Sequence, residues 1–270
     1  WWDWRFLGLL ILSTIVDYIV SLYIHNSEGK KKSIFLAISL ITNLGILGFF
    51  KYYNFFIDSW VEAWARVGYE VHIPSISIVL PVGISFYTFQ TLSYSIDIYR
   101  NKLVPAKDFI SFAAFVSFFP QLVAGPIERA ANLLPQFQVR RCFNIDHAKD
   151  GMRQMLWGFF KKIVIADNCA KFVDQIFSNS DAYSGSTLAI GAVLFSFQIY
   201  CDFSGYSDIA IGSARLFGFE LMQNFRFPYF SKNISEFWQR WHISLTSWFK
   251  DYLYIPLGGS REGILKTVRN

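Results

Sequence analysis

The class of this chain is decided by a run of twenty residues without a single charge, which reads A-Y-S-G-S-T-L-A-I-G-A-V-L-F-S-F-Q-I-Y-C from Ala182 to Cys201. Three more uncharged runs precede it, at Ser33 to Phe50, Ile73 to Ile96 and Phe109 to Ile127. The hydrocarbon core of a bilayer is about 30 Å thick, and a helix needs roughly 20 apolar residues to cross it. The sequence therefore predicts an all-α, polytopic membrane protein that is embedded in the lipid bilayer.

Composition agrees with this class and argues against others. Hydrophobic residues make up 53% and charged residues 17% of the 270 positions, whereas soluble domains carry about 25% charged residues. A net charge of +5 is ordinary under the positive-inside rule, and no interleaved basic and aromatic pattern indicates nucleic-acid binding. The three cysteines are far apart and the four histidines have no metal-ligand spacing, so neither a disulfide framework nor a metal site is expected.

The N-terminal part is predicted to cross the membrane twice. A first span runs from Phe6 to Val20, and Asp17 near its end is interpreted as an interfacial residue, with a buried functional acid as the alternative. Three lysines, Lys30 to Lys32, predict a cytoplasmic loop before the second span. The charge-balanced segment from Lys51 to His72 is then typical of an amphipathic helix on the outer surface.

The next two uncharged runs are both interrupted. Pro81 and Gly83 break the run from Ile73 to Ile96, and such a break is tolerated only where protein or water covers the freed backbone groups. The run from Phe109 to Ile127 is followed by an excess of basic residues, which places both of its ends on the cytoplasmic side. We therefore predict that this second run is a re-entrant segment, which implies an enclosed cavity around it.

Two further helices are expected before the C-terminal part. A long amphipathic helix covers Gly151 to Phe177, and its adjacent lysines, Lys161–Lys162, are predicted to reach lipid headgroups. The uncharged span quoted above ends in C-D-F-S-G-Y-S-D, from Cys201 to Asp208, where Gly205 bends the chain before a second helical segment from Ile209 to Phe219. The dense polar groups of this motif line a polar vestibule or form a plain interfacial turn.

The stretch from Asn233 to Gly259 is predicted to be one helix. Asn233 can cap its start, with Glu236 as the capping-box partner, and aromatic residues recur along one face at helical spacing. His242 lies at the edge of that aromatic stripe, and a titratable imidazole among tryptophans is a candidate for function. The alternative is a packed, hydrogen-bonded structural histidine.

Three motifs follow one another along most of the chain. They are F-F-P-Q-L-V-A-G-P-I at Phe118 to Ile127, C-D-F-S-G-Y-S-D at Cys201 to Asp208, and F-W-Q-R-W-H-I-S-L at Phe237 to Leu245. The set resembles the membrane-bound O-acyltransferase family, in particular its bacterial alginate O-acetylation branch, with the D-alanyl lipoteichoic-acid transferase as a further relative.

The resemblance implies a fold and an activity. The fold would be a ring of tilted, often re-entrant helices around a tunnel, in which a cytoplasmic acyl donor meets an acceptor presented from the other face. The donor would be acetyl-CoA or an acyl carrier, without a bound cofactor, and the acceptor would be an exported polysaccharide such as alginate. Periplasmic polysaccharide-modifying proteins would be the partners, and the bacterial inner membrane would be the location.

The resemblance also implies site residues. His242 matches the family's histidine in the W-H-I-S-L motif and is the expected catalytic residue. The residues expected to line the tunnel are Trp238, Arg240, Trp241, Asp202, Ser204, Tyr206 and Asp208. The family's second histidine belongs to a later apolar segment, so we expect it beyond Asn270. Residues 1–270 are accordingly expected to form a single membrane domain that is incomplete at both ends and inactive alone.

Two other function classes stay open. A transporter or flippase also uses broken helices and polar groups at membrane depth, although the chain has no internal repeat of the kind transporters often carry. A non-catalytic subunit of a polysaccharide export complex is the other alternative. No G-x-S-x-G, H-E-x-x-H, Walker or G-x-G-x-x-G motif occurs, which leaves His242 as the only well-placed general base.

Overall fold

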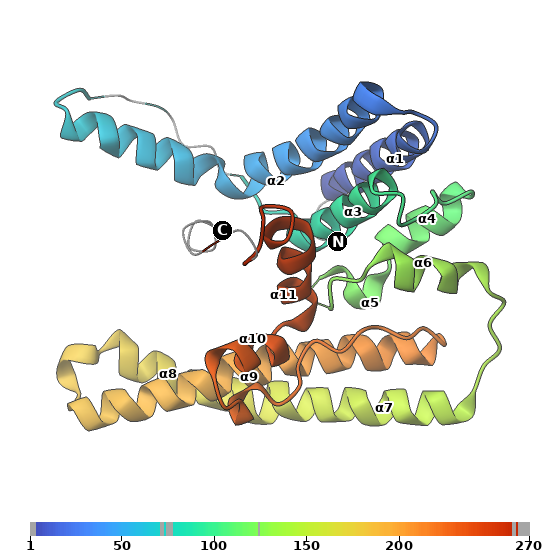
Figure 1. Cartoon of the computed structure of the whole chain (residues 1–270). Coiled ribbons are helices and arrows are strands. Elements are labelled where there is room, and N and C mark those ends of the chain that lie inside the picture. The colour runs from blue at the N-terminus through green and yellow to red at the C-terminus, as the bar shows by residue number, and fades with distance from the viewer. Residues whose placement is uncertain (1–3, 71–72, 74–77, 124, 261–262, 264–270) are drawn as a thin grey trace. The chain divides into compact units, whose positions relative to one another are not determined.

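The computed structural model describes residues 4–70, 73, 78–123, 125–260 and 263, and over these residues the chain forms helices and no strand (Figure 1). The helices gather into two compact units, one of Trp1–Ser117 with Arg129–Leu134 and one of Phe118–Glu128 with Pro135–Asn270. Within the described part of the chain, three helices are long and apolar enough to cross a membrane. This confirms the prediction of an all-α polytopic membrane protein, while the single membrane domain stays a prediction.

The first unit is built on two long apolar helices. Its helices are α1 (Trp4–His25), α2 (Gly29–Arg66), α3 (Ile84–Tyr99) and α4 (Phe109–Val116). The three lysines at 30–32 lie in the first turn of α2, not in a loop, and α2 continues without interruption into the segment predicted to be a separate surface helix, as far as Arg66. No proline occurs between Gly29 and Arg66, so nothing in the chain forces the helix to end earlier.

Asp17 is fully buried, which corrects its interpretation as an interfacial residue. Its carboxylate accepts hydrogen bonds from Ser39 Oγ at 2.6 Å and from Asn43 Nδ2 at 2.9 Å, both on α2. Asn43 Oδ1 accepts in turn from Ser13 Oγ at 3.0 Å and from Thr91 Oγ1, on α3, at 3.1 Å. Small hydroxyl side chains of this kind allow transmembrane helices to approach closely and bond to one another. The Asp17 network therefore joins α1, α2 and α3.

Both predicted interruptions are present. Gly83 adopts a left-handed φ of 75° immediately before α3, so the helix covers only the second half of the run from 73 to 96; residues 74–77 of that run lie outside the described residues. The run from 109 to 127 is divided at Ser117 between α4 and α5 (Phe119–Leu122). Whether this second run enters and leaves the membrane on one side stays a prediction.

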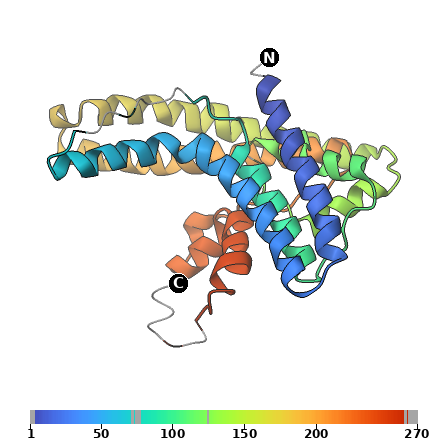
Figure 2. The ribbon, with the colours of Figure 1, turned by 90° about the horizontal axis from the view of Figure 1, so that it is seen from above.

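The second unit is organised around one hairpin of long helices. Its first arm is α7 (Ile145–Phe159), followed without a break by the π-helical turn η1 (Phe160–Ala166) and by α8 (Asp167–Ser178). Its second arm is α9 (Gly185–Leu216), which runs back along the whole first arm (Figures 1 and 2). The remaining helices are η2 (Ser180–Ala182), η3 (Pro228–Phe230), α10 (Ile234–Arg240), α11 (Ile243–Phe249) and η4 (Lys250–Tyr254), while α6 (Ala130–Gln138) is divided between the units.

Two pairs of glycines set the distance between the arms of this hairpin. A Cβ built on Gly205 would lie 2.7 Å from the carbonyl oxygen of Gly158, and one on Gly212 would lie 2.4 Å from that of Gly151. Only glycine fits such a contact between two backbones. The prediction that Gly205 bends the chain is therefore wrong, because α9 is continuous there and Gly205 serves close packing instead.

Candidate active site

The helix predicted over 233–259 is interrupted at Trp241 and His242. The Asn233 cap is present, because Asn233 Oδ1 accepts from the Glu236 amide at 2.8 Å. However, α10 ends at Arg240, Trp241 is extended, and His242 has a positive φ of 43°. Positive φ is uncommon for a residue with a Cβ and occurs where surrounding contacts enforce it. The prediction of one continuous helix with His242 on its aromatic face is therefore wrong.

The contacts that enforce the break come from the loop after α9. The Ile243 amide donates to the Asn224 carbonyl oxygen at 2.9 Å, and the Arg226 amide donates to the Arg240 carbonyl oxygen at 2.9 Å. Asn224 is fully buried, and its side-chain Oδ1 accepts from both the amide and the hydroxyl of Ser244, at 3.2 and 2.9 Å. Sequence reasoning missed Asn224, because nothing in the local pattern connects it to a residue 18 positions later.

The same asparagine defines the tautomer of His242. His242 Nδ1 lies 3.0 Å from Asn224 Oδ1. That atom must be the amide oxygen, because the Ser244 backbone N–H donates to it and an amide nitrogen could not accept. His242 Nδ1 therefore carries the hydrogen, and Nε2 carries the free lone pair. No group in the described part of the chain forms a hydrogen bond with Nε2.

Aromatic rings surround the imidazole. The His242 ring packs edge to face against Phe203, with 4.7 Å between ring centroids, and lies nearly parallel to Phe225 at 6.4 Å. Burial among these groups lowers the pKa of His242 to about 4, because a charged imidazolium is poorly solvated there. The side chain is therefore neutral near pH 7 and presents Nε2 as a hydrogen-bond acceptor.

The other predicted residues of the F-W-Q-R-W-H motif have different surroundings. Trp241 stacks on Phe237, with 5.5 Å between ring centroids, and belongs to an aromatic cluster with Tyr229. Trp238 is 51% exposed. Arg240 forms an ion pair of 2.5 Å with Glu236, four residues earlier on α10, which is the spacing that brings two side chains together on one helix face.

A buried ion pair lies between the two arms of the helical hairpin. Lys161 in η1 is 7% exposed, and its Nζ lies 2.5 Å from Asp208 Oδ2 and 3.0 Å from Ser204 Oγ, both on α9. Gln154 Nε2 donates to the other oxygen of Asp208 at 2.9 Å. Lys161 does not reach lipid headgroups, which corrects the sequence interpretation. The π-helical turn changes the register of the arm at this point, and helical spacing in the sequence gives no signal of it.

Lys162 and two of the predicted tunnel residues, Asp202 and Tyr206, lie at the surface. Lys162 Nζ is 2.6 Å from Asp202 and 2.7 Å from Asp167, with all three side chains partly exposed. Tyr206 is 37% exposed. These residues therefore lie on the outer side of α9, away from the Lys161–Asp208 pair.

A cavity of about 540 Å³ lies beside the Lys161–Asp208 pair. Seven of its 17 lining residues are aromatic, and its polar lining includes Lys161, Ser204, Asp208 and the Asn224 that holds His242. Two of the seven predicted tunnel residues, Ser204 and Asp208, therefore line this cavity. The other five and His242 lie outside its lining as far as the structure describes the chain. Over the same residues, no cluster of His, Cys, Asp and Glu could hold a metal ion.

Comparison with known proteins supplies the family. The family model for MBOAT, the membrane-bound O-acyltransferase family, matches residues 106–270. The chain is 42% identical to the probable alginate O-acetylase AlgI of Azotobacter vinelandii, over all of this chain and 54% of that protein. It is 37% identical to the peptidoglycan O-acetyltransferase of Helicobacter pylori, over all of this chain and 55% of that protein.

A more distant relative points the same way. The teichoic acid D-alanyltransferase of Bacillus subtilis is 28% identical over 69% of this chain and 48% of its own length. The chain thus spans about half the length of the curated relatives it matches.

Proposed function

This chain belongs to the membrane-bound O-acyltransferase family, and from that membership we propose that the protein is a membrane O-acetyltransferase that acts on an exported polysaccharide. The relatives over the whole chain are named for the O-acetylation of alginate and of peptidoglycan, which supports an acetyl group and a glycan hydroxyl. The donor is acetyl-CoA or an acyl carrier on the cytoplasmic side. Periplasmic partner proteins bring the acceptor to this protein, which lies in the bacterial inner membrane.

The observation that carries the proposal is the open lone pair of His242, whose Nδ1 is held by Asn224, a residue that lines the cavity. A hydroxyl that attacks an acyl donor must lose its proton, and a positioned base contributes typically 10²–10⁴-fold to such a step. With Nδ1–H held by Asn224, His242 can only accept at Nε2. It therefore orients the attacking hydroxyl or assists its proton transfer, and it does not donate to the acyl carbonyl.

The low pKa of His242 limits its share of the chemistry. A pKa of about 4 is well below the operating pH, whereas the best general base has a pKa close to it. We infer that His242 holds the hydroxyl in place while the second family histidine, in the part of the protein beyond this chain, is the stronger proton acceptor. This division agrees with the resemblance to the family.

The cavity supplies the complementary charge. Acyl transfer develops negative charge on the carbonyl oxygen, and donors preorganised in a dry site stabilise it. Lys161 Nζ and Ser204 Oγ are 3.0 Å apart on the cavity wall, and we assign them to the carbonyl of the bound acyl group. In this proposal Asp208 holds Lys161 in position, and the aromatic walls exclude water.

The remaining tunnel residues are assigned to the path that leads to and from this centre. Trp238 and Trp241 wall the tunnel, Arg240 contacts the donor, and Asp202 and Tyr206 lie near its rim. Such a tunnel is implied by the family resemblance and is a proposal for this chain.

The test uses the natural full-length protein in its own host. O-acetyl ester content of the exported polysaccharide is measured for wild type and His242→Ala at equal protein levels in the membrane. Arg153→Gln, an exposed basic position on α7, is the matched control. Loss of ester with normal polymer export supports the acetyltransferase.

The other outcomes identify the rival functions. Loss of the polymer itself in His242→Ala identifies a transporter. Normal ester content in His242→Ala shows that His242 takes no part in the transfer. Purified full-length protein that fails to take up a labelled acyl donor points to a non-catalytic subunit.

A further inference from the structure

A group of lysines lies at one end of the first unit, where the turn between α1 and α2 meets the turn between α3 and α4 (Figures 1 and 2). Segments 26–33 and 97–108 form this end and carry six Lys or Arg residues and three Asp or Glu residues. We call its lysines the lysine cluster, which consists of Lys30, Lys31, Lys32, Lys102 and Lys107. Three of them lie in the first turn of α2, which contains no acidic residue, although the positive end of a helix dipole disfavours further positive charge.

Side-chain contacts hold the two turns together. Lys32 Nζ donates to Asn101 Oδ1 at 2.6 Å and lies 5.6 Å from the centre of the Tyr99 ring. Ser33 Oγ lies 3.1 Å from the Tyr99 hydroxyl. Asn101 has a positive φ of 58°, which asparagine adopts more readily than most residues. The lysines of the two turns are therefore kept on one surface.

The charge of the lysine cluster is not compensated within the protein. None of the five lysines forms an ion pair with a carboxylate in the part of the chain that the structure describes. Of the nearby carboxylates, Asp108 caps α4 and accepts from the amide and the hydroxyl of Ser111, both at 2.8 Å. Glu28 is exposed and does not cap α2 with its side chain. The positive charge is therefore available to an anion from outside the chain.

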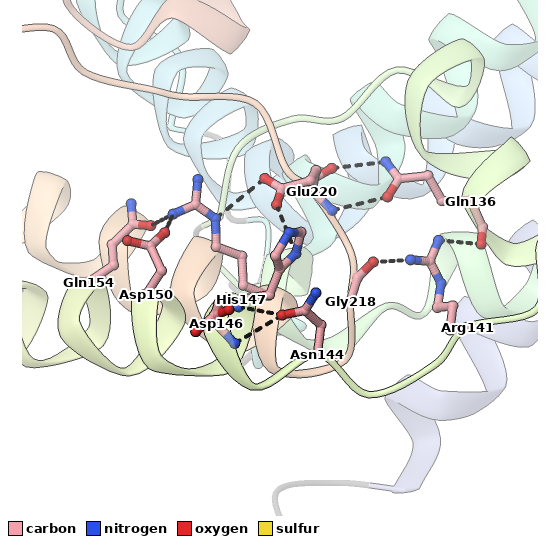
Figure 3. Close-up of polar contacts among 10 residues, drawn as sticks. Gln136, Arg141, Asn144, Asp146, His147, Asp150, Gln154, Gly218 and Glu220 are labelled. Atoms are coloured by element: carbon pink, nitrogen blue, oxygen red, sulfur yellow. Dashed lines mark hydrogen bonds and ion pairs between the residues drawn. The ribbon is translucent and has the colours of Figure 1, made fainter.

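Basic side chains near the start of α7 in the second unit are used differently. Arg215 forms ion pairs with Asp150 and Glu220, and Arg141 donates to two backbone carbonyl oxygens (Figure 3). These guanidinium groups connect segments of the fold to one another. The lysine cluster, apart from the single hydrogen bond of Lys32, makes no such connection in the described structure.

Exposed apolar side chains flank the lysines and indicate the kind of anion. Val104 lies between Lys102 and Lys107 in sequence and is 63% exposed, and Ile110 shortly after them is 75% exposed. Ile34, which follows the lysines of α2, is also exposed. Lysines beside exposed apolar groups are typical of a surface at the membrane interface, where the apolar groups enter the acyl layer and the ammonium groups contact phosphates. A soluble phosphate would make no use of the apolar side chains.

The lysine cluster also lies at the depth of the lipid headgroups. The uncharged run of α2 begins at Ser33, directly after Lys32, and the apolar span of α1 ends at His25 on the other side of the turn. Basic residues immediately beside a membrane helix attract anionic headgroups. We propose that the lysine cluster is a binding site for the phosphate of an anionic phospholipid such as phosphatidylglycerol, with Val104 and Ile110 against the acyl chains of that lipid. This site is independent of the proposed transfer chemistry.

The experiment titrates the full-length protein in neutral detergent with phosphatidylglycerol or phosphatidylcholine and measures bound lipid by native mass spectrometry. The double variant Lys30→Gln/Lys31→Gln removes two exposed charges that make no hydrogen bond or ion pair in the described structure, so the fold is kept. We expect it to weaken the tightest binding of phosphatidylglycerol about tenfold, because two charges near the phosphate are lost. Binding of phosphatidylcholine and the melting temperature in neutral detergent should not change.

Two further variants separate a local site from other effects. Lys149→Gln/Lys171→Gln makes the same change in net charge at exposed positions of α7 and α8 and should bind phosphatidylglycerol like wild type. Ile110→Ser keeps every charge and should weaken binding of the lipid, because the acyl chains lose an apolar contact. Inorganic phosphate at millimolar concentration should not displace the lipid from wild type.

Several outcomes would overturn the assignment. Equal affinity of Lys30→Gln/Lys31→Gln and wild type for phosphatidylglycerol would show that the lysines do not bind it. Equal weakening by the Lys149→Gln/Lys171→Gln control would mean that only net charge matters. Displacement of the lipid by inorganic phosphate, or unchanged lipid binding in Ile110→Ser, would identify a phosphate site without a lipid. Because the measured quantity is lipid binding, none of these results depends on whether the protein transfers acetyl groups.

Discussion

Asp17 in the first unit and His242 in the second are both titratable groups enclosed by hydrogen bonds, but only one of them has an unused bonding position. The Asp17 carboxylate accepts from Ser39 and Asn43, and Asn43 Oδ1 is itself occupied by two hydroxyls. His242 is held through Nδ1 alone, and Nε2 stays open. The closed network ties helices together, whereas the open one can act on another molecule.

The two sites also treat charge differently. No Lys, Arg or His in the described part of the chain forms an ion pair with Asp17, which is solvated by neutral donors only. Around the cavity, by contrast, Lys161 compensates Asp208 directly. A polar group inside a membrane helix is costly unless it is partnered, and the molecule has met that requirement in two ways. The five predictions below test this contrast.

The largest effect is expected from His242→Ala. If the open lone pair positions the hydroxyl for transfer, the turnover rate falls by about 10²-fold, while the melting temperature in detergent changes little. Steady-state acetyl transfer and thermal unfolding of the same preparation give both values. A loss of activity that follows the loss of folded protein would make His242 a structural residue like Asp17 and end the contrast.

Asp17→Leu is expected to act in the opposite way. It removes the carboxylate that accepts from Ser39 and Asn43 inside the first unit, and each buried donor left unsatisfied costs about 1–3 kcal/mol. Asp17→Asn keeps one acceptor and should cost about 1–3 kcal/mol. Denaturant unfolding in detergent measures the stability, and turnover per folded molecule should stay at the wild-type value. A variant that is stable but inactive would contradict a purely structural role for Asp17.

Lys161→Met tests the compensated carboxylate. Removal of the ammonium leaves Asp208 with Gln154 as its only hydrogen-bond partner among the described residues, and we expect a loss of about 1–3 kcal/mol. The double variant Lys161→Met/Asp208→Leu should recover much of this loss, because a buried pair replaced as a whole is often neutral. Unfolding of both single variants and the double variant completes the cycle. Equal losses for the single and double variants would show that the two side chains are not coupled.

The depressed pKa of His242 makes stability depend on pH. In the unfolded chain a histidine binds a proton near pH 6.5, whereas the folded site does so only near pH 4. The unfolded state therefore binds more protons between these values, and stability falls as the pH is lowered through that window. We expect a loss of about 1 kcal/mol between pH 7 and 5.5. His242→Gln should remove this part of the slope, and an unchanged slope would count against a buried neutral imidazole.

The smallest effect is expected from Asp202→Asn. Asp202 and Asp208 are six residues apart on α9, but the Lys162–Asp202 pair is partly exposed and Lys162 keeps Asp167 as a partner. Exposed ion pairs contribute roughly 0–1 kcal/mol. Thermal unfolding should therefore show almost no change, and a loss as large as that of Lys161→Met would mean that the outer side of α9 is covered in the native membrane.

The sequence predicted what local spacing controls. The uncharged runs identified the membrane class, Asn233 and Glu236 identified a helix start, and Pro81 with Gly83 identified an interruption. Each of these signals acts within a few residues. The motif histidine could also be found, because few titratable residues lie within aromatic segments.

The rest depends on contacts between distant segments. The break at Trp241 has no glycine or proline beside it and is enforced by Asn224, so the aromatic spacing continues across it without a sign. The side chain of Lys161 points inward because Lys161 lies in a π-helical turn, which shifts the register of the helix. Asp17 is buried because α2 and α3 bring hydroxyl and amide groups to it, which a hydropathy pattern does not reveal.

The glycine contacts between α7 and α9 restrict how the chain length can vary. Gly151 meets Gly212 and Gly158 meets Gly205. The two glycines on α7 are seven residues apart, as are the two on α9, which is about two helical turns. One inserted or deleted residue between Gly205 and Gly212 would rotate one contact by roughly 100° and bring a side chain against a backbone. Length changes should therefore be absent from this segment in related sequences and concentrated in the connection from 179 to 184.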